Sequence, residues 1–101
     1  MSYQVRVSRR AGREIRKAAT WWLENREKAP SAFADDLDDA LHLLAHLPKV
    51  GEAVHHATIS TARRLLLTRT QHHLYYSVSD SSKTVEVLVL WHASRGSAPR
   101  F

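Results

Sequence analysis

The sequence predicts an α+β domain in which an antiparallel two-helix hairpin packs on one face of a mainly antiparallel sheet, in the order β-α-α-β-β-β. Three observations predict this class. A short alternating segment opens the chain, two segments with helical spacing of apolar residues follow, and three β-rich runs separated by turn sequences fill the second half. Two helices joined by a short link must bury their apolar stripes against a flat surface, which the strands supply.

The first strand and the first helix follow each other directly. Residues 3–7 alternate apolar and polar side chains, which is typical of a strand with one buried face. Ser8 is suited to cap a helix, and apolar residues recur at helical spacing from Ala11 to Trp22. Polar residues fall at other positions, namely Arg9, Arg13, Arg16, Lys17 and Thr20. We therefore predict an amphipathic helix with a strongly basic face, followed by the polar stretch 24–28.

A second helix is predicted to start near Pro30, since proline suits the first turn of a helix. From Phe33 to Leu47 six apolar residues form a stripe about five turns long. Aspartates near its beginning suit the positive end of the helix dipole. Pro48 ends the helix, and Gly51 marks the turn after it.

The second half of the chain predicts an antiparallel meander. Residues 54–61 have no clear period and are expected to form a surface loop, with room for a short strand. The predicted strands cover residues 62–68, 73–79 and 84–92, with turns at 69–72 and 80–83. The last run is apolar at nearly every position, so we expect it to be covered most fully on both faces. Residues 93–101 are predicted to form a tail.

Composition limits the class of protein. The 101 residues, 44% of them hydrophobic and 25% charged, suit one globular domain over residues 1–101. No apolar run has the length of a membrane span, and the first residues lack a secretory signal. The chain has no cysteine, which excludes a disulfide, a thiol nucleophile and a thiolate metal site. We expect a cytoplasmic protein with no membrane association and no cofactor.

The net charge of +5 indicates an acidic partner, either nucleic acid or an anionic protein segment. The charge is unevenly distributed. Residues 1–28 carry eight Lys and Arg against three Glu, and residues 29–51 carry one Lys against four Asp. Residues 52–101 carry six Lys and Arg against three acidic residues. The basic charge therefore lies toward both ends of the chain.

The strongest grouping of functional side chains is expected on the sheet. Antiparallel pairing gathers cationic and aromatic residues of three strands: Arg63, Arg64, His73, Tyr75, Tyr76, His92 and Arg95. Strand alternation places Tyr76 on the opposite face from His73 and Tyr75, and we expect Leu74, Tyr76 and Val78 to be the inward set. Such a patch can bind phosphate, and imidazole can transfer a proton near neutral pH. The alternative is ordinary packing by the aromatic residues and solubility from the arginines.

Two other groups have both a functional and a structural interpretation. His42 and His46 lie one helical turn apart, but no Glu follows His42 as in zinc proteases. We therefore favour polar residues flanking the helix stripe over a metal site. Trp21 and Trp22 point about 100° apart, so Trp22 fits the stripe and Trp21 lies at its edge. There Trp21 is either partly buried or an anchor for a partner helix.

Five short motifs occur in a fixed order along the chain. They are Ser8-Arg9-Arg10-Ala11, Leu47-Pro48-Lys49-Val50-Gly51, Arg63-Arg64-Leu65, Leu74-Tyr75-Tyr76-Ser77-Val78 and Val87-Leu88-Val89-Leu90-Trp91-His92-Ala93-Ser94-Arg95. Each motif is degenerate, but their order and spacing together resemble the RelE/ParE superfamily of bacterial toxins over nearly the whole chain. The resemblance implies a toxin that a cognate antitoxin keeps silent in a toxin–antitoxin hetero-oligomer.

The resemblance leaves two activities to choose between. RelE-like members cut mRNA on the ribosome, and their best-known branch uses a C-terminal Tyr as proton donor, whereas ParE-like members inhibit DNA gyrase. Arg64 and Arg95 fall at basic positions of the RelE pattern, but His73 stands where Arg is usual and Phe101 where the Tyr would be. The segment 91–95 is more similar to the ParE branch. The resemblance therefore favours a gyrase inhibitor that is not an enzyme.

Two alternatives stay open. One is a ribosome-dependent endoribonuclease whose candidate catalytic residues are Arg64, His73, His92 and Arg95. The other is an inactive toxin that only binds its antitoxin. For the favoured hypothesis, the expected target-binding residues are Arg63, Arg64, Tyr75, His92 and Arg95. The expected antitoxin-binding residues are Arg9, Arg13, Arg16 and Trp21, because a basic helix face suits an acidic antitoxin segment.

Overall fold

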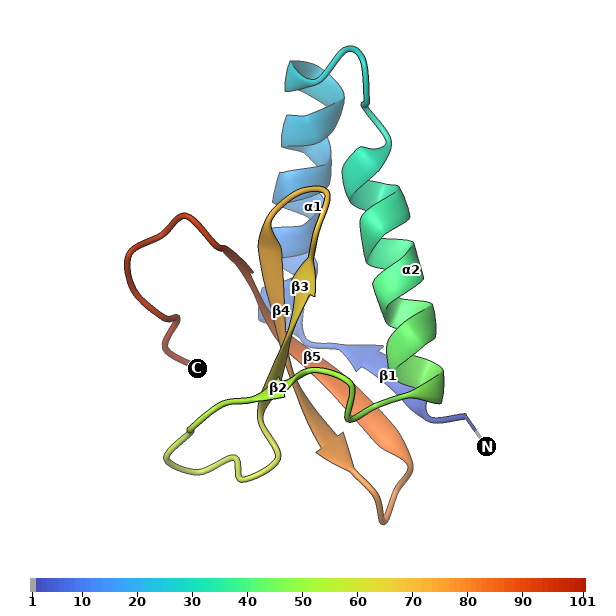
Figure 1. Cartoon of the computed structure of the whole chain (residues 1–101), viewed down its shortest axis with the longest axis vertical. Helices are drawn as coiled ribbons and strands as arrows, with labels where there is room; N and C mark the ends of the chain where they lie inside the picture. The colour runs from blue at the N-terminus through green and yellow to red at the C-terminus, as the bar shows by residue number, and fades with distance from the viewer. Residues whose placement is uncertain (1) are drawn as a thin grey trace.

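A computed structural model describes residues 2–101 and confirms the predicted α+β fold (Figure 1). Its elements in chain order are β1 (Gln4–Val7), α1 (Arg9–Asn25), α2 (Ala32–His46), β2 (Glu52–Ala53), β3 (Arg63–Leu67), β4 (His72–Ser79) and β5 (Thr84–His92). The strands form one sheet in the order β1-β5-β4-β3-β2. β1 pairs with β5 in parallel and the other neighbours are antiparallel, so the sheet is mainly antiparallel.

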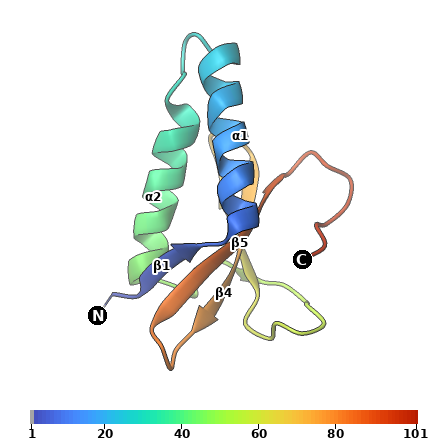
Figure 2. The ribbon, with the colours of Figure 1, turned by 180° about the vertical axis from the view of Figure 1, so that it is seen from behind.

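The two helices form the predicted antiparallel hairpin and cover one face of the sheet (Figures 1 and 2). Ser8 caps α1, because its Oγ accepts a hydrogen bond from the backbone N–H of Ala11 at 3.1 Å. Ala11 is fully buried, and Ile15 and Trp22 pack against the core. The apolar stripe of α1 therefore faces the sheet. Within residues 2–101, neither helix is long and apolar enough to cross a membrane.

α2 begins at Ala32, two residues after the proline that was expected to open it. Pro30 and Ser31 form a turn, and Oγ of Ser31 donates to the carboxylate of Asp35 at 3.1 Å. Ser31 therefore makes no side-chain cap to the helix backbone. The helix ends at His46, in agreement with the predicted stop at proline, because the ring of a proline disfavours the helical conformation in the residue before it.

The core lies between the helices and the sheet. Its largest fully buried side chains on this side are Phe33, Leu44, Leu67, Leu74, Tyr76, Val85 and Val87. Together with Val78, which is also buried, they confirm the inward set predicted for β4. Val5 of β1 packs against this core, but Val7 is 43% exposed. β1 is an edge strand, so only part of its alternating pattern is covered.

β4, not β5, is the strand covered most fully on both faces. The expectation for β5 rested on its continuous apolar run, but β5 exposes Glu86 and leaves Leu88 half-buried. β4 is the middle strand, and it buries Leu74 and Tyr76 against the helices and Tyr75 on the opposite face. Coverage follows the place of a strand in the sheet, which the apolar pattern of that strand does not reveal.

A β-bulge at Leu88 sets which residues of β5 face the helices. In the pairing with β4, Tyr75 lies opposite Val89 and Tyr76 lies opposite Val87, so Leu88 is an extra residue without a partner. The bulge reverses the alternation of β5 at this point. The apolar residues on both sides of it are therefore buried, although strict alternation would expose some of them.

The bulge also fixes α1 to the sheet. Its extra residue allows Val87 and Leu90 to reach the same core cluster. The backbone carbonyl of Leu88 accepts a hydrogen bond from Oγ of Ser8 at 3.1 Å, and the N–H of Leu90 donates to the carboxylate of Glu14 at 3.1 Å. The backbone of β5 at the bulge is thus bonded to Ser8, the cap of α1, and to Glu14 of α1.

Residues 93–101 pack back onto the sheet instead of forming the predicted tail. They contain no helix or strand, and Figure 1 shows them curling back toward the sheet. The Phe101 ring lies 5.4 Å from the Tyr75 ring and 4.7 Å from the His56 ring, measured between centroids. Pro99 is buried. This segment therefore covers Tyr75 on the face that the helices leave open.

Gly51 lies in the predicted turn after α2, where the chain packs closely against β3 and β4. Its N–H donates to Oη of Tyr76 at 2.9 Å. A Cβ at this position would lie 2.5 Å from the same Oη and 2.6 Å from the carbonyl oxygen of Arg64. No side chain fits there, so the path from α2 into β2 depends on glycine.

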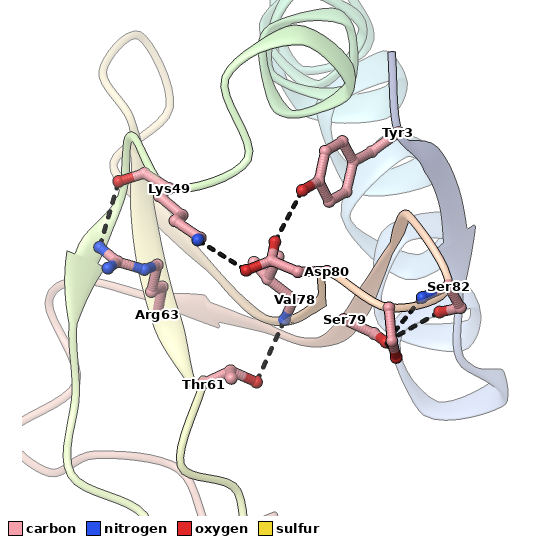
Figure 3. A network of polar contacts seen from close by, with 9 residues as sticks. Tyr3, Lys49, Thr61, Arg63, Val78, Ser79, Asp80 and Ser82 are labelled. Atoms are coloured by element: carbon pink, nitrogen blue, oxygen red, sulfur yellow. Dashed lines mark hydrogen bonds and ion pairs between the residues drawn. The ribbon is translucent and has the colours of Figure 1, made fainter. Parts of the chain in front are cut away.

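A polar network joins the start of the chain, the α2–β2 connection and the β4–β5 turn (Figure 3). The carboxylate of Asp80 accepts hydrogen bonds from Nζ of Lys49 at 2.7 Å and from Oη of Tyr3 at 2.6 Å. These two bonds lower the pKa of Asp80, and the partner groups show raised pKa values because of the same bonds. The network lies at the surface, and it fixes three distant segments relative to one another.

Candidate functional site

The sheet divides the predicted target-binding residues between its two faces. Arg64 and Tyr75 are cross-strand neighbours on the face away from the helices, which we call the outer face. Side chains alternate along a strand, so Arg63 lies on the helix face, together with its cross-strand neighbour Tyr76. His92 is also on the helix face. The structure therefore brings together only part of the predicted set.

The outer face holds a small cluster around Arg64. Its guanidinium contacts the Glu52 carboxylate at 2.8 Å and donates to Oη of Tyr75 at 3.5 Å. The bond to Tyr75 and the bonds to Glu52 raise the pKa of Arg64. The His73 ring lies 6.1 Å from the Tyr75 ring, and burial together with the charge of Arg64 lowers the pKa of His73. The cluster thus offers a neutral imidazole beside one guanidinium that a carboxylate already neutralises.

Arg63 holds the connection between α2 and β2. Its guanidinium donates to the backbone carbonyl of Gly51 at 2.7 Å. It also donates to that of Lys49 at 3.1 Å (Figure 3). Both acceptors belong to the segment that follows α2. This geometry gives Arg63 a part in positioning the chain, in addition to the predicted part in target binding.

The helix side carries a groove between the second half of α1 and the ends of β4 and β5. It is about 400 Å³ in volume, and its walls include Trp21, Trp22 and Arg26 from α1 and His72 and His92 from the sheet. Trp22 packs against the core, whereas Trp21 at the edge is 46% exposed, as their spacing predicted. The two indoles meet edge to face with centroids 5.9 Å apart.

The groove continues along α1 toward the end of β5. A second hollow of about 310 Å³ shares Trp21 with the first and adds Lys17 and Arg95. The Arg95 guanidinium lies 4.3 Å from the centre of the Trp91 ring, a cation–π contact. Nδ1 of His92 accepts a hydrogen bond from the N–H of Ser94 at 3.1 Å. His92 and Arg95 therefore line a hollow together with Trp21, and His92 lies on the opposite face of the sheet from Tyr75.

His72 forms the floor of the groove. Its ring contacts the Phe33 ring at 5.3 Å and the His92 ring at 4.9 Å, and its Nδ1 lies 3.2 Å from Oγ1 of Thr70. Burial, followed by the nearby charge of His92, lowers the pKa of His72 to about 4. His72 is therefore neutral at pH 7. The sequence pattern had placed this residue in a turn, and only the pairing of His72 with His92 shows its position.

Asp36 is a second residue whose role the sequence interpretation missed. Its buried carboxylate accepts hydrogen bonds from the N–H of Arg69 at 3.1 Å and that of Thr70 at 3.3 Å, and so holds the β3–β4 turn under α2. A signal for this role exists in the sequence. Asp36 is three residues after Phe33 and four before Ala40, so it lies on the apolar stripe of α2.

The basic face of α1 is exposed to solvent. Arg9, Arg13 and Arg16 recur along this face, and within residues 2–101 no ion pair involves them. Arg10, by contrast, pairs with Glu14 at 3.3 Å. The helix therefore presents three unneutralised guanidinium groups to solvent, as its sequence pattern predicted.

His42 and His46 do not converge on a common ion. Nδ1 of each ring lies close to the backbone carbonyl of the residue four positions earlier, at 2.9 Å for His42 and 3.0 Å for His46. Among residues 2–101, no group of three or more His, Asp or Glu has the geometry to hold a metal ion. The two rings thus stay on the exposed side of α2.

Comparison with known families matches residues 5–96 to the ParE toxin of type II toxin–antitoxin systems, parDE. No curated protein matches the chain. The matched range includes both helices, the groove and all five strands except Gln4, the first residue of β1, and it ends before the last five residues.

Solved structures with the same fold come from both branches of the superfamily. A chain of the RelBE2 toxin–antitoxin complex from Mycobacterium tuberculosis has a TM-score of 0.66 at 23% identity, covering 93% of this chain and 95% of that one. A chain of the chromosomal ParDE system from P. aeruginosa has a TM-score of 0.69 at 17% identity, covering 91% of this chain and 97% of that one. The isolated RelE toxin from E. coli has a TM-score of 0.67 at 20% identity, covering 93% of this chain and 87% of that one. These likenesses establish the fold.

Proposed function

Because the chain belongs to the ParE toxin family of type II toxin–antitoxin systems, we propose that it inhibits DNA gyrase and that a cognate antitoxin neutralises it. The observation that carries the choice of target is the division of the candidate catalytic residues by the sheet. His73 lies on the outer face and His92 on the helix side. A nuclease that used either imidazole would need it at the same phosphate as both arginines, and only His73 lies on the face that carries Arg64.

The C-terminal residues add to the argument against RNA cleavage. Phe101 lies against Tyr75 on the outer face, where its ring provides packing but no hydroxyl proton. Arg64 is engaged by Glu52, so its charge is partly neutralised before any phosphate arrives. General acid–base catalysis contributes about 10²- to 10⁴-fold to such reactions, and the Phe101 side chain supplies none of it on this face.

The antitoxin is proposed to bind the helix side of the domain. Arg9, Arg13 and Arg16 form an unneutralised row on α1, and Trp21 follows on the same helix with nearly half of its surface exposed. An acidic antitoxin segment would neutralise the row and cover the indole. On the target side, we propose that Arg64 and Tyr75 contribute from the outer face, and that His92 and Arg95 contribute from the groove, while Arg63 supports them through the α2–β2 connection.

Purified toxin should inhibit ATP-dependent supercoiling of relaxed plasmid by DNA gyrase, and premixing with the antitoxin should restore supercoiling. Induced expression should arrest growth and trigger a DNA-damage response. Intact DNA together with mRNA 5′ ends phased to codons would instead establish the ribonuclease alternative. Normal growth after induction, with the antitoxin complex still formed, would establish an inactive toxin.

A further inference from the structure

The groove beside Trp21 combines an apolar interior with a basic rim. Trp22 and Leu90, both packed in the core, form part of its inner wall. Lys17, Arg26 and Arg95 stand around its edge. Grooves that accept another molecule commonly have this build, with apolar walls and a few polar groups that set orientation.

The cations of this rim are not neutralised by carboxylates of the described residues, although Arg26 and Arg95 contact indole rings. Within residues 2–101 neither Lys17, Arg26 nor Arg95 takes part in an ion pair. The carboxylate that lines the groove belongs to Glu14, and it is already bound to Arg10 at 3.3 Å and to the backbone of β5. The groove therefore has an excess of positive charge, and the complementary partner is acidic.

The arrangement of the indoles favours a protein side chain over a nucleobase. Trp21 and Trp22 meet at an interplanar angle of 73°, so they form a corner and not a parallel stack. The Arg26 guanidinium lies 5.2 Å from the centre of one ring and 5.3 Å from the other. It therefore occupies ring faces on which a base would stack. A branched or aromatic side chain can fill such a corner by contact with its edges.

We propose that this groove docks an acidic segment of the toxin's target protein, which inserts one aromatic or long aliphatic side chain beside Trp21. This inference rests on the proposed function, in which that target is DNA gyrase. Trp21 then belongs to both contacts, so bound antitoxin would block the groove to the target. Trp and Arg dominate the energetics of protein interfaces, particularly when they line a pocket that water leaves on binding. The neutral imidazole of His72 at the floor suits an apolar anchor, because it adds no charge that would need a counterion.

The test compares gyrase inhibition and gyrase binding by the wild type and matched pairs of variants. Trp21→Ala should weaken both by about tenfold or more, whereas Leu23→Ala on the same helix should change neither. Leu23 is a fair control because its side chain is 66% exposed and lies outside the groove. Trp21→Phe should retain most of the inhibition. Thermal denaturation of each variant checks that it is folded.

A second pair tests the charged rim. Arg95→Gln should weaken binding to gyrase at low salt. The loss of affinity relative to the wild type should be smaller at high salt, because salt screens the rim charges, which act mainly on the association rate. Arg6→Gln removes the same charge from the exposed side of β1 and should have no effect. A labelled single-stranded oligonucleotide is titrated in parallel against the wild type and Trp21→Ala.

The outcomes separate this inference from the proposed function. If the wild type inhibits gyrase, and both variants, Trp21→Ala and Arg95→Gln, inhibit it equally well, then the groove is not the docking site. Gyrase inhibition itself would still stand. If the wild type leaves gyrase unaffected, the proposed function fails and this inference fails with it. Loss of oligonucleotide binding in Trp21→Ala, with gyrase inhibition unchanged, would assign the groove to nucleic acid and overturn the protein partner.

Discussion

Gly51 illustrates how a single residue decides the path of the chain between α2 and the sheet. Its φ is not positive, so the requirement for glycine comes from space and not from backbone conformation. The hydroxyl of Tyr76 and the backbone of β3 leave no room for a Cβ, and that same hydroxyl accepts the N–H of Gly51. The sequence marked this position as a turn, but only the fold shows which atoms crowd it.

We expect Gly51→Ala to lower the free energy of unfolding by about 1–3 kcal/mol, because the backbone of Arg64 must shift to make room. Chemical denaturation measures this change. Gly96→Ala is the matched control, since a Cβ at that position meets no atom within 4 Å. Equal stability of the two variants would show that the close approach at Gly51 is relaxed at little cost.

His72 is a residue whose titration is linked to folding. In the folded chain its pKa is lowered to about 4 by burial, whereas an unfolded chain binds the proton with a pKa near 6.5. Between these two values the unfolded state binds more protons than the folded state. The free energy of unfolding must therefore decrease as the pH falls from about 6.5 toward 4, and it is unaffected by this group above that range.

Thermal denaturation between pH 7 and pH 4 should accordingly show a loss of stability of up to about 3 kcal/mol that depends on His72. In His72→Asn this part of the pH dependence should disappear, whatever the stability of the variant at pH 7. His55→Asn, which changes an exposed histidine, should leave the wild-type slope intact. A slope that persists in His72→Asn would assign the pH dependence to other groups.

At the scale of the elements, the contribution of α2 to stability comes from the helix face that packs on the sheet. Leu44 is fully buried between the helix and the sheet, whereas the adjacent Leu43 is 37% exposed. Leu44→Ala should lower the free energy of unfolding by about 2–5 kcal/mol through lost burial and the cavity it leaves. Leu43→Ala should cost much less. Comparable losses in urea denaturation of the two variants would mean that the helix is rotated from the orientation described above.

The position of the β3–β4 turn depends on a residue of α2, a different element. Asp36 of α2 binds the backbone of this turn, and His72 at the start of β4 closes the groove next to it. Period and turn chemistry locate the strands on both sides of the turn. They do not reveal that a helix carboxylate holds the turn, because that bond joins residues more than thirty positions apart.

The domain as a whole has a strongly uneven charge. α1 presents unpaired arginines, and the segment around α2 carries an excess of aspartates. Long-range attraction between a basic surface and an acidic partner accelerates association, and salt screens it. The proposed antitoxin contact should therefore respond to ionic strength more through its association rate than through its dissociation rate.

The double substitution Arg13→Gln and Arg16→Gln should slow association with the antitoxin and flatten its dependence on salt. Stopped-flow mixing at several salt concentrations measures both quantities. Arg6→Gln combined with Lys83→Gln removes the same charge at exposed positions outside α1 and serves as the control. An unchanged association rate in the α1 variant would move the antitoxin contact away from this helix face.

The pattern of neighbouring residues was sufficient to predict the elements that depend on residues close together in the sequence. Apolar period, the cap at Ser8 and the turn residues located both helices, the meander and the strand alternation, because these depend on residues close together in sequence. The order and spacing of the motifs also led to the toxin superfamily. α2 begins at Ala32 and not near Pro30, because Pro30 and Ser31 form a turn in which the N–H of Ala32 donates to the carbonyl of Ala29.

The tertiary structure alone decided which candidate residues meet. The sheet separates His73 from His92, the middle position of β4 gives it the fullest cover, and residues 93–101 return to cover Tyr75. Each of these facts depends on strand order, register or the bulge at Leu88, which are set by contacts between distant segments. A sequence states which chemical groups are present, but their distances follow only once the whole chain has packed.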